Sequence, residues 1–176
     1  MHTYISILRG INVSGQKKIR MSDLKILYEN LGFTDIITFI QSGNVIFKTN
    51  LKMTNSKLAK IIEDKIIETY SFNVPVIIRT PAELNAIVNK NPFKNNELDS
   101  LYITFLSNDP NSVNLEKLEN LSFLPDNFEI IDKEIYLSVD RYGNTKLSNN
   151  FFESKLKVCA STRNMKTILS LIELSQ

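Results

Sequence analysis

The sequence predicts an α+β fold in which two α/β plaits follow each other along the chain. Short β-branched segments alternate with segments whose apolar residues recur at helical spacing. Up to residue 79 the predicted order is β-α-β-β-α-β, the order of a ferredoxin-like plait, and a less regular version follows. Turn-forming residues at 89–100 separate the two halves. We therefore predict an N-terminal domain at 1–92 and a C-terminal domain at 93–176 that ends in a helix.

The first domain is predicted to begin with a strand at residues 3–8 and an amphipathic helix. Ser22 is expected to cap this helix, and Gly32 is expected just past its last turn. Its buried residues follow the spacing i, i+3, i+4, i+7 and are Leu24, Leu27, Tyr28 and Leu31.

A predicted hairpin, a second helix and a fourth strand complete this domain. Residues 35–40 and 45–48 read as strands that a Ser-Gly-Asn turn joins. Thr54 can cap the next helix, and residues 74–79 form a strand. Thr80, Pro81 and Glu83 then make the start signal of a further helix, with Thr80 and Glu83 as a capping box.

The second domain repeats this rhythm with shorter elements. The predicted strands are 101–106, 127–131 and 134–139, and the predicted helices are one around Leu115 and Leu118, one at 147–156, and a last helix that opens near 161–164.

Composition excludes several classes of function. The chain has 21 basic and 19 acidic residues, so its net charge of +2 creates no global field for nucleic acid or membrane. The single cysteine, Cys159, rules out an intrachain disulfide, and the single histidine, His2, sits beside a terminus. Histidine-based catalysis and metal sites are therefore disfavoured, and we predict no metal and no cofactor. Without a secretory signal or a membrane-length apolar run, we predict a cytoplasmic protein.

A basic, glycine-containing loop at residues 9–20 is the first candidate site. Its glycines permit close backbone approach to an anion, and its cations and Asn12 add further contacts. It matches neither a Walker loop nor a dinucleotide fingerprint, and a solvated basic loop is the alternative. The candidate ligand-binding residues here are Arg9, Gly10, Asn12, Gly15, Lys17 and Lys18.

Two further stretches are candidates, and each has a structural alternative. One is the turn Ser42, Gly43 and Asn44, where such residues are expected in any tight hairpin. The other is Thr162, Arg163 and Asn164, which we expect to open the last helix and offer an anion its amides and an arginine. Ordinary helix capping by Ser161 or Thr162 is the alternative.

Three stretches resemble domain-of-unknown-function family 1697, a group of bacterial proteins; they are residues 4–21, 32–47 and 160–171. The runs Leu-Arg-Gly-Ile-Asn-Val and Gln-Ser-Gly-Asn are specific to it. The resemblance spans nearly the whole chain and implies two ferredoxin-like plaits, with no established activity, substrate or catalytic residue. The family commonly has Gly-Gly in place of Ser14-Gly15, so a positive φ at Ser14 would be strained. It often has Trp in place of Met165, where we expect packing.

Three functions fit these observations. The first is a binding protein or an enzyme for a phosphate-bearing or other small anionic ligand, with the three candidate stretches converging on one cleft. An enzyme of this kind would rely on electrostatic stabilisation by Arg9, Arg163 and backbone amides. The second is RNA binding, although Gly43–Phe47 lacks the aromatic RNP1 pattern. The third is a homodimeric interaction module that pairs through sheet edges.

Overall fold

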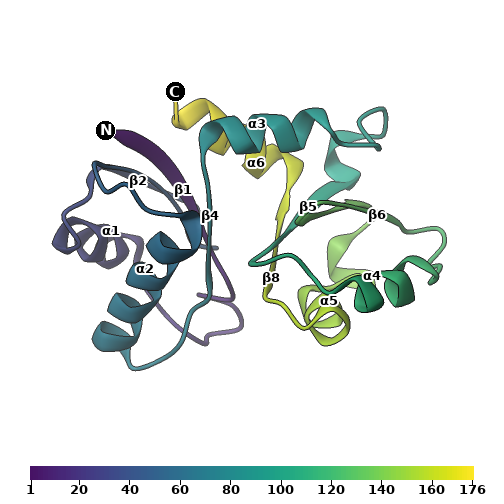
Figure 1. Ribbon diagram of the computed structural model, residues 1–176, viewed down its shortest axis with the longest axis horizontal. Coiled ribbons are helices and arrows are strands. Elements are labelled where there is room, and N and C mark those ends of the chain that lie inside the picture. The colour runs from purple at the N-terminus through teal and green to yellow at the C-terminus, as the bar shows by residue number, and fades with distance from the viewer. The chain divides into compact units, whose positions relative to one another are not determined.

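The computed structural model describes residues 1–176 and contains six α-helices and two four-stranded antiparallel sheets (Figure 1). The predicted mixture of helices and strands is therefore confirmed. The chain forms two compact units: unit 1 comprises residues 1–85 and 170–176, and unit 2 comprises residues 86–169. The domain boundary between residues 92 and 93 stays a prediction. None of the helices is both long and apolar enough to cross a membrane.

Unit 1 is built around a central strand, β1, which is antiparallel to both β3 and β4. Its sheet has the order β2-β3-β1-β4. The elements are β1 (His2–Leu8), α1 (Met21–Asn30), β2 (Thr34–Phe39), β3 (Asn44–Thr49), α2 (Asn55–Tyr70) and β4 (Val76–Arg79). The helix α3 (Pro81–Asn89) starts in this unit and ends in the next. The element order predicted up to residue 79 is confirmed.

Unit 2 is built around β5 in the same way, with the sheet order β6-β7-β5-β8. The elements are β5 (Leu101–Leu106), α4 (Ser112–Glu119), β6 (Asn127–Ile131), β7 (Glu134–Ser138), α5 (Asn149–Leu156) and β8 (Ala160–Asn164). The helix α6 (Met165–Leu174) starts in this unit, and its residues from 170 onward belong to unit 1. Two short 3-10 helices, Leu98–Ser100 and Tyr142–Asn144, precede β5 and α5.

The prediction that the last helix opens near residues 161–164 was wrong. These residues belong to β8, which pairs with β5 and places the hydroxyls of Thr104 and Thr162 2.7 Å apart. The helix begins only at Met165, which is buried, and Asn164 caps it by accepting a hydrogen bond from the Thr167 amide at 2.8 Å. Ser161 and Thr162 are residue types that cap helices, but Thr also favours strands. The pairing with β5 therefore decides that these residues form a strand.

The two sheets repeat the same register around their central strands, β1 and β5. Ile5 lies opposite Arg79 in unit 1, and Ile103 lies opposite Arg163 in unit 2. In both units the last residue of the central strand donates its amide to the turn between the hairpin strands, at 2.8 Å in unit 1 and 2.9 Å in unit 2. The position of a residue in one unit can therefore be compared directly with its counterpart in the other.

Helix α1 has no side-chain cap at its N-terminus, and a glycine motif ends it at its C-terminus. The helix begins at Met21, so Arg20 and not Ser22 occupies the N-cap position, and no side chain caps it. The predicted end is confirmed, because Gly32 has a φ of 79°. The Phe33 amide then donates to the Tyr28 carbonyl at 3.2 Å, which completes a glycine-dependent C-terminal motif.

Both predicted caps of the later helices in unit 1 are confirmed. The Thr54 hydroxyl accepts a hydrogen bond from the Lys57 amide at 3.3 Å at the start of α2. At α3 the Glu83 amide donates to the Thr80 hydroxyl at 3.2 Å, and the Thr80 amide donates to the Glu83 carboxylate at 2.6 Å. These reciprocal bonds form a capping box.

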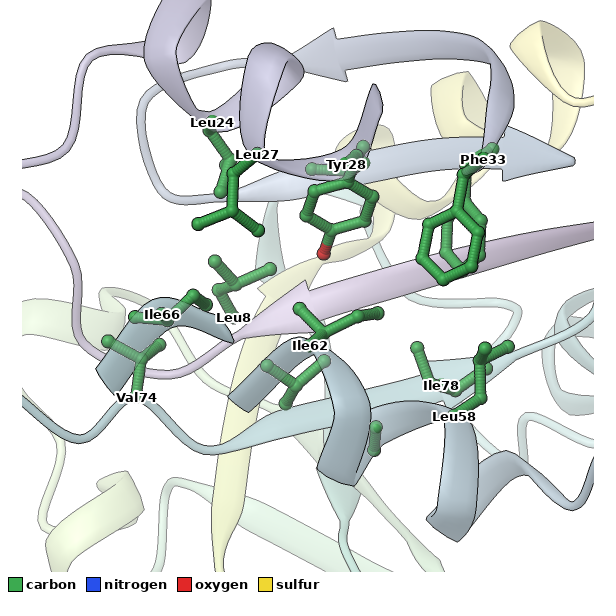
Figure 2. Close-up of a cluster of buried hydrophobic side chains, with 14 of the residues drawn as sticks. Leu8, Leu24, Leu27, Tyr28, Phe33, Leu58, Ile62, Ile66, Val74 and Ile78 are labelled. Carbon is green, nitrogen blue, oxygen red and sulfur yellow. The ribbon is translucent and has the colours of Figure 1, made fainter. Parts of the chain in front are cut away.

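The core of unit 1 lies between one face of the sheet and the helices α1 and α2, whose apolar side chains point toward each other in Figure 2. Phe47 is completely buried at its centre, with its ring centroid 4.6 Å from Phe33 and 5.3 Å from Tyr28. The Tyr28 hydroxyl lies 2.7 Å from the Ser6 hydroxyl. Burial raises the pKa of Tyr28 above its ordinary value, and the bond to Ser6 offsets only part of this.

Candidate functional site: a loop cluster in unit 1

Three loops meet at one end of the unit 1 sheet. Because β1 is antiparallel to β3 and β4, its last residue lies beside their first residues. The loop after β1, the turn between β2 and β3, and the connection from α2 to β4 therefore share this end; they are residues 9–20, 40–43 and 71–75. The Leu8 amide donates to the Gly43 carbonyl at 2.8 Å, and the Arg9 amide donates to the Pro75 carbonyl at 2.9 Å. We call these three segments the loop cluster.

The loop after β1 contains a small hairpin of its own. Val13 and Gln16 form an antiparallel bridge, and the Gln16 amide donates to the Val13 carbonyl at 2.9 Å. The two residues between them both have positive φ, 49° at Ser14 and 76° at Gly15. Two consecutive positive φ values are typical of a type I′ turn, which suits the twist of a two-residue hairpin. Gly15 therefore has a definite structural role, and Ser14 has the positive φ that would strain it.

Replacing Ser14 with glycine is expected to raise the free energy of unfolding by roughly 0.5–1 kcal/mol. Glycine adopts a positive φ without the clash of a Cβ atom, although it loses more conformational entropy on folding. Urea unfolding followed by circular dichroism would measure the change. Gln16→Gly, whose backbone is not in this region, is the matched control and should lower stability. Equal effects of the two substitutions would contradict this account of the turn.

The Asn12 side chain holds the loop in shape. Its Nδ2 donates to the Ile19 carbonyl at 2.9 Å, and its Oδ1 accepts from the Ile19 amide at 2.9 Å. The same Nδ2 also donates to the Gln41 carbonyl at 3.0 Å, which ties the loop to the hairpin turn. Asn12 itself has a φ of 56°. These bonds make Asn12 a positioning residue of the loop cluster.

The four cations of the loop have different surroundings. The Lys17 ammonium donates to the Asn73 carbonyl at 2.7 Å and so ties the loop to the connection before β4. Arg9 and Lys17 are half-buried, whereas Lys18 and Arg20 are exposed. Lys18 and Arg20 are therefore the cations that water, or a ligand, reaches most easily.

The hairpin turn is held by Asn44, which is completely buried at the start of β3. Its Nδ2 donates to the Phe39 carbonyl at 3.1 Å and to the Ser42 hydroxyl at 3.2 Å. Gly43 has a φ of 81° and packs directly against Ile11 of the preceding loop. The predicted residues of this turn thus lie beside those of the basic loop, and the structure brings two of the three candidate stretches together.

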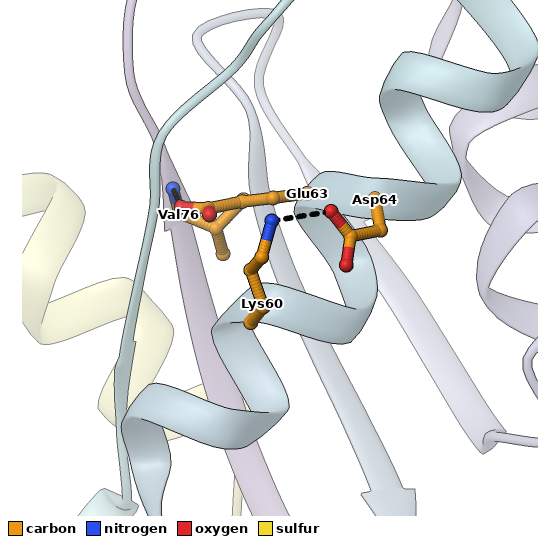
Figure 3. A network of polar contacts seen from close by, with 4 residues as sticks. All are labelled: Lys60, Glu63, Asp64 and Val76. Atoms are coloured by element: carbon orange, nitrogen blue, oxygen red, sulfur yellow. Dashed lines mark hydrogen bonds and ion pairs between the residues drawn. The ribbon is translucent and has the colours of Figure 1, made fainter.

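The loop cluster contains no acidic residue. Glu63 of α2 reaches across to β4, where its carboxylate accepts a hydrogen bond from the Val76 amide at 2.8 Å (Figure 3). On the same helix Lys60 and Asp64 form an ion pair of their own. The cations of the loop cluster therefore outweigh the negative charge at this end of the sheet.

The third candidate stretch lies in unit 2, on β8. Thr162 donates its hydroxyl to the Asn149 side chain at 2.7 Å, and Asn164 caps α6. The guanidinium of Arg163 is buried and donates to the Ser161 hydroxyl at 3.0 Å and to the Thr162 carbonyl at 2.9 Å. The convergence of these residues with the loop cluster stays a prediction.

Arg79, the counterpart of Arg163 in unit 1, carries no sequence motif that marks it as a candidate. It is also buried, and its Nη1 donates to the carbonyl of the preceding residue, Ile78, at 2.9 Å. Arg163 makes the same contact to its own predecessor at the same distance. Only the shared strand register reveals this equivalence, because the residues around the two arginines differ in sequence.

Comparison with known proteins shows the family of the chain and its fold. The family described as protein of unknown function (DUF1697) matches residues 1–136, and the chain belongs to this family. The chain is also similar to the solved structure of a conserved bacterial protein from Streptococcus pneumoniae, with 19% sequence identity and a TM-score of 0.77 over 99% of both chains. No curated protein matches the sequence.

Proposed function

We propose that the loop cluster binds a phosphate-bearing or otherwise anionic small ligand. Four cations, Arg9, Lys17, Lys18 and Arg20, fall within twelve residues, and no acidic residue is present in the three segments. Cationic side chains bind phosphates and carboxylates through charge-assisted hydrogen bonds. Lys18 and Arg20 supply the first contacts because they are exposed. Asn12 and Asn44 hold the loops that carry them.

A comparison between the two units carries the proposal. Unit 2 makes the same three connections with shorter segments, residues 107–111, 132–133 and 157–159, where unit 1 uses residues 9–20, 40–43 and 71–75. The sheet order, and the register around the central strand, are nevertheless the same. The extra length in unit 1 is therefore not needed to build the sheet. Long loops at one end of a rigid scaffold are where binding residues concentrate.

Sodium tripolyphosphate is a suitable probe because it carries negative charge without a base or a sugar. Isothermal titration should detect binding to the wild-type chain, and thermal melting should show a rise with probe concentration. Lys18→Ala and Arg20→Ala should each weaken binding by roughly tenfold, since each removes a charge-assisted contact.

Lys117→Ala is the matched control, because Lys117 is an exposed lysine on α4 in unit 2. It should leave the affinity unchanged. Absence of binding to the wild-type chain, or equal losses in all three variants, would contradict the proposed site.

RNA binding and homodimer formation stay predictions, and two measurements on the same purified protein distinguish them from anion binding. RNA binding through the basic loop would appear as affinity for a single-stranded oligonucleotide that falls steeply with salt. Homodimer formation would appear as a mass that depends on concentration in analytical ultracentrifugation.

We also infer that each unit is a ferredoxin-like plait. The order β-α-β-β-α-β with two neighbouring antiparallel pairs around the first strand supports this assignment in both units. The helices α3 and α6 follow the last strand of each unit as additions to this pattern.

A further inference from the structure

A groove of about 320 Å³ lies between α1 and α2 in unit 1. The residues from α1 follow the spacing i, i+3, i+4, i+7 along one flank of the helix, and the end of α2 supplies the opposite wall. Its walls are formed by Asp23, Ile26, Leu27 and Asn30 from α1, and by Lys65, Thr69 and Tyr70 from α2. The groove thus has apolar and aromatic walls with a few polar groups, the usual composition of a small-molecule site.

This groove adjoins the loop cluster at both walls. Arg20 is the residue directly before α1, and Tyr70 is the last residue of α2. The Tyr70 ring stacks on Phe72, a residue of the loop cluster, with centroids 5.7 Å apart and an interplanar angle of 22°. The next residue, Asn73, accepts the hydrogen bond from Lys17. The loop cluster therefore continues directly into both walls of the groove.

We propose that the groove binds the heterocyclic base of a nucleotide whose phosphates lie on the loop cluster. The inference rests on the proposed anion site and names the ligand class for it. A nucleotide combines a multiply charged anion, which suits the cations of the loop cluster, with a flat aromatic ring, which suits the groove.

The groove suits a base in shape and in hydrogen bonding. Ile26, Leu27 and the Tyr70 ring provide apolar and aromatic surface, and stacking on aromatic side chains is a general way to bind bases. Asn30 offers donors and acceptors for the edge of the ring, and Thr69, whose hydroxyl donates to the Lys65 carbonyl at 2.8 Å, offers an acceptor. The Tyr70 hydroxyl is protonated at neutral pH and can donate, and burial, followed by the nearby Asp23 carboxylate, raises its pKa further.

A second groove in unit 1 does not fit this ligand. It has a volume of about 470 Å³ and lies between α1 and the first half of β2, at the end of the strand opposite the loop cluster. Its walls include Glu29 and Asp35, and Asp35 is held in an ion pair with Lys48. A nucleotide with its phosphates on the loop cluster cannot also place its base there.

The test compares ATP, GTP, CTP and UTP with sodium tripolyphosphate by isothermal titration on the full chain. We expect at least one nucleotide to bind about tenfold tighter than tripolyphosphate, because the base adds contacts in the groove. Equal affinity for all five compounds would overturn the base-binding inference and leave the anion site standing. Absence of binding for all five would overturn both.

Two substitutions locate the base. Ile26→Trp fills the groove without changing the charge, and it should reduce the affinity of the best nucleotide to that of tripolyphosphate. Ile67→Trp is the matched control, because Ile67 is an exposed isoleucine on α2 outside the groove, and it should change neither affinity. Tyr70→Leu should act like Ile26→Trp by removing the stacking surface. Retention of full nucleotide affinity in both groove variants would overturn the inference.

Discussion

Replacing Gly43 with alanine is expected to lower the free energy of unfolding by about 3 kcal/mol. Two costs add at this position. The backbone has a φ of 81°, which strains any residue with a Cβ atom. The new Cβ would also lie 2.6 Å from Cδ1 of Ile11 and 2.9 Å from Cβ of Leu8. The Leu8 atom is fixed to a central strand, so the clash can be relieved only by moving the hairpin turn.

Substitutions at two other glycines distinguish the cost of the positive φ from the cost of the steric clash. Gly32 has a similar φ of 79° but open space around it, so Gly32→Ala should cost only about 1 kcal/mol. Gly143 has open space and no positive φ, so Gly143→Ala should leave stability nearly unchanged. Urea unfolding of the three variants tests the ranking. A Gly43→Ala variant no less stable than Gly32→Ala would show that the contact with Ile11 and Leu8 is unimportant.

Phe47→Ala is expected to lower the free energy of unfolding by about 4 kcal/mol, because it removes a completely buried ring and leaves a cavity. The loss is enlarged by ring contacts with Tyr4, Tyr28 and Phe33, which no neighbour can replace. Thermal and urea unfolding would measure it.

Phe47→Leu serves as the control for that cavity. It keeps most of the apolar volume and should cost about 1.5 kcal/mol. If Phe47→Ala lowered the free energy of unfolding by less than about 1 kcal/mol, the core would have to collapse around the vacant space, and it would not be closely packed.

Much of the fold was predictable where local signals agree with burial. The capping box at Thr80 and the glycine at the end of α1 are read directly from residue types, and the structure confirms both. The start of α1 was misplaced because Ser22 is a good cap but the helix starts one residue before it. Strand β8 (Ala160–Asn164) was missed because four of its five residues are polar, so the sequence shows no alternation of apolar and polar residues there. Its pairing with β5 is a long-range contact that no local pattern encodes.

The candidate site was predictable in composition but not in geometry. The sequence identified the cations and the Ser42 turn, and the structure places these two stretches side by side. The sequence did not show that Asn12, Lys17 and Asn44 use their side chains to hold the loops together. The sequence also did not indicate the groove beside Tyr70, because that groove depends on how α1 and α2 pack. The excess length of the unit 1 loops became visible only when both sheets could be compared.

The irregular pairing of β2 bears on how the chain behaves at high concentration. The register between β2 and β3 shifts between Thr34 and Ile37, where Asp35 has a φ of 50° and forms an ion pair with Lys48 at 2.8 Å. A bulge with a charged residue makes an outer strand a poor template for a strand from another molecule. One outer strand of unit 2, β6, pairs with β7 without any shift. Of these two outer strands, β6 is therefore the better template for edge-to-edge pairing with another molecule.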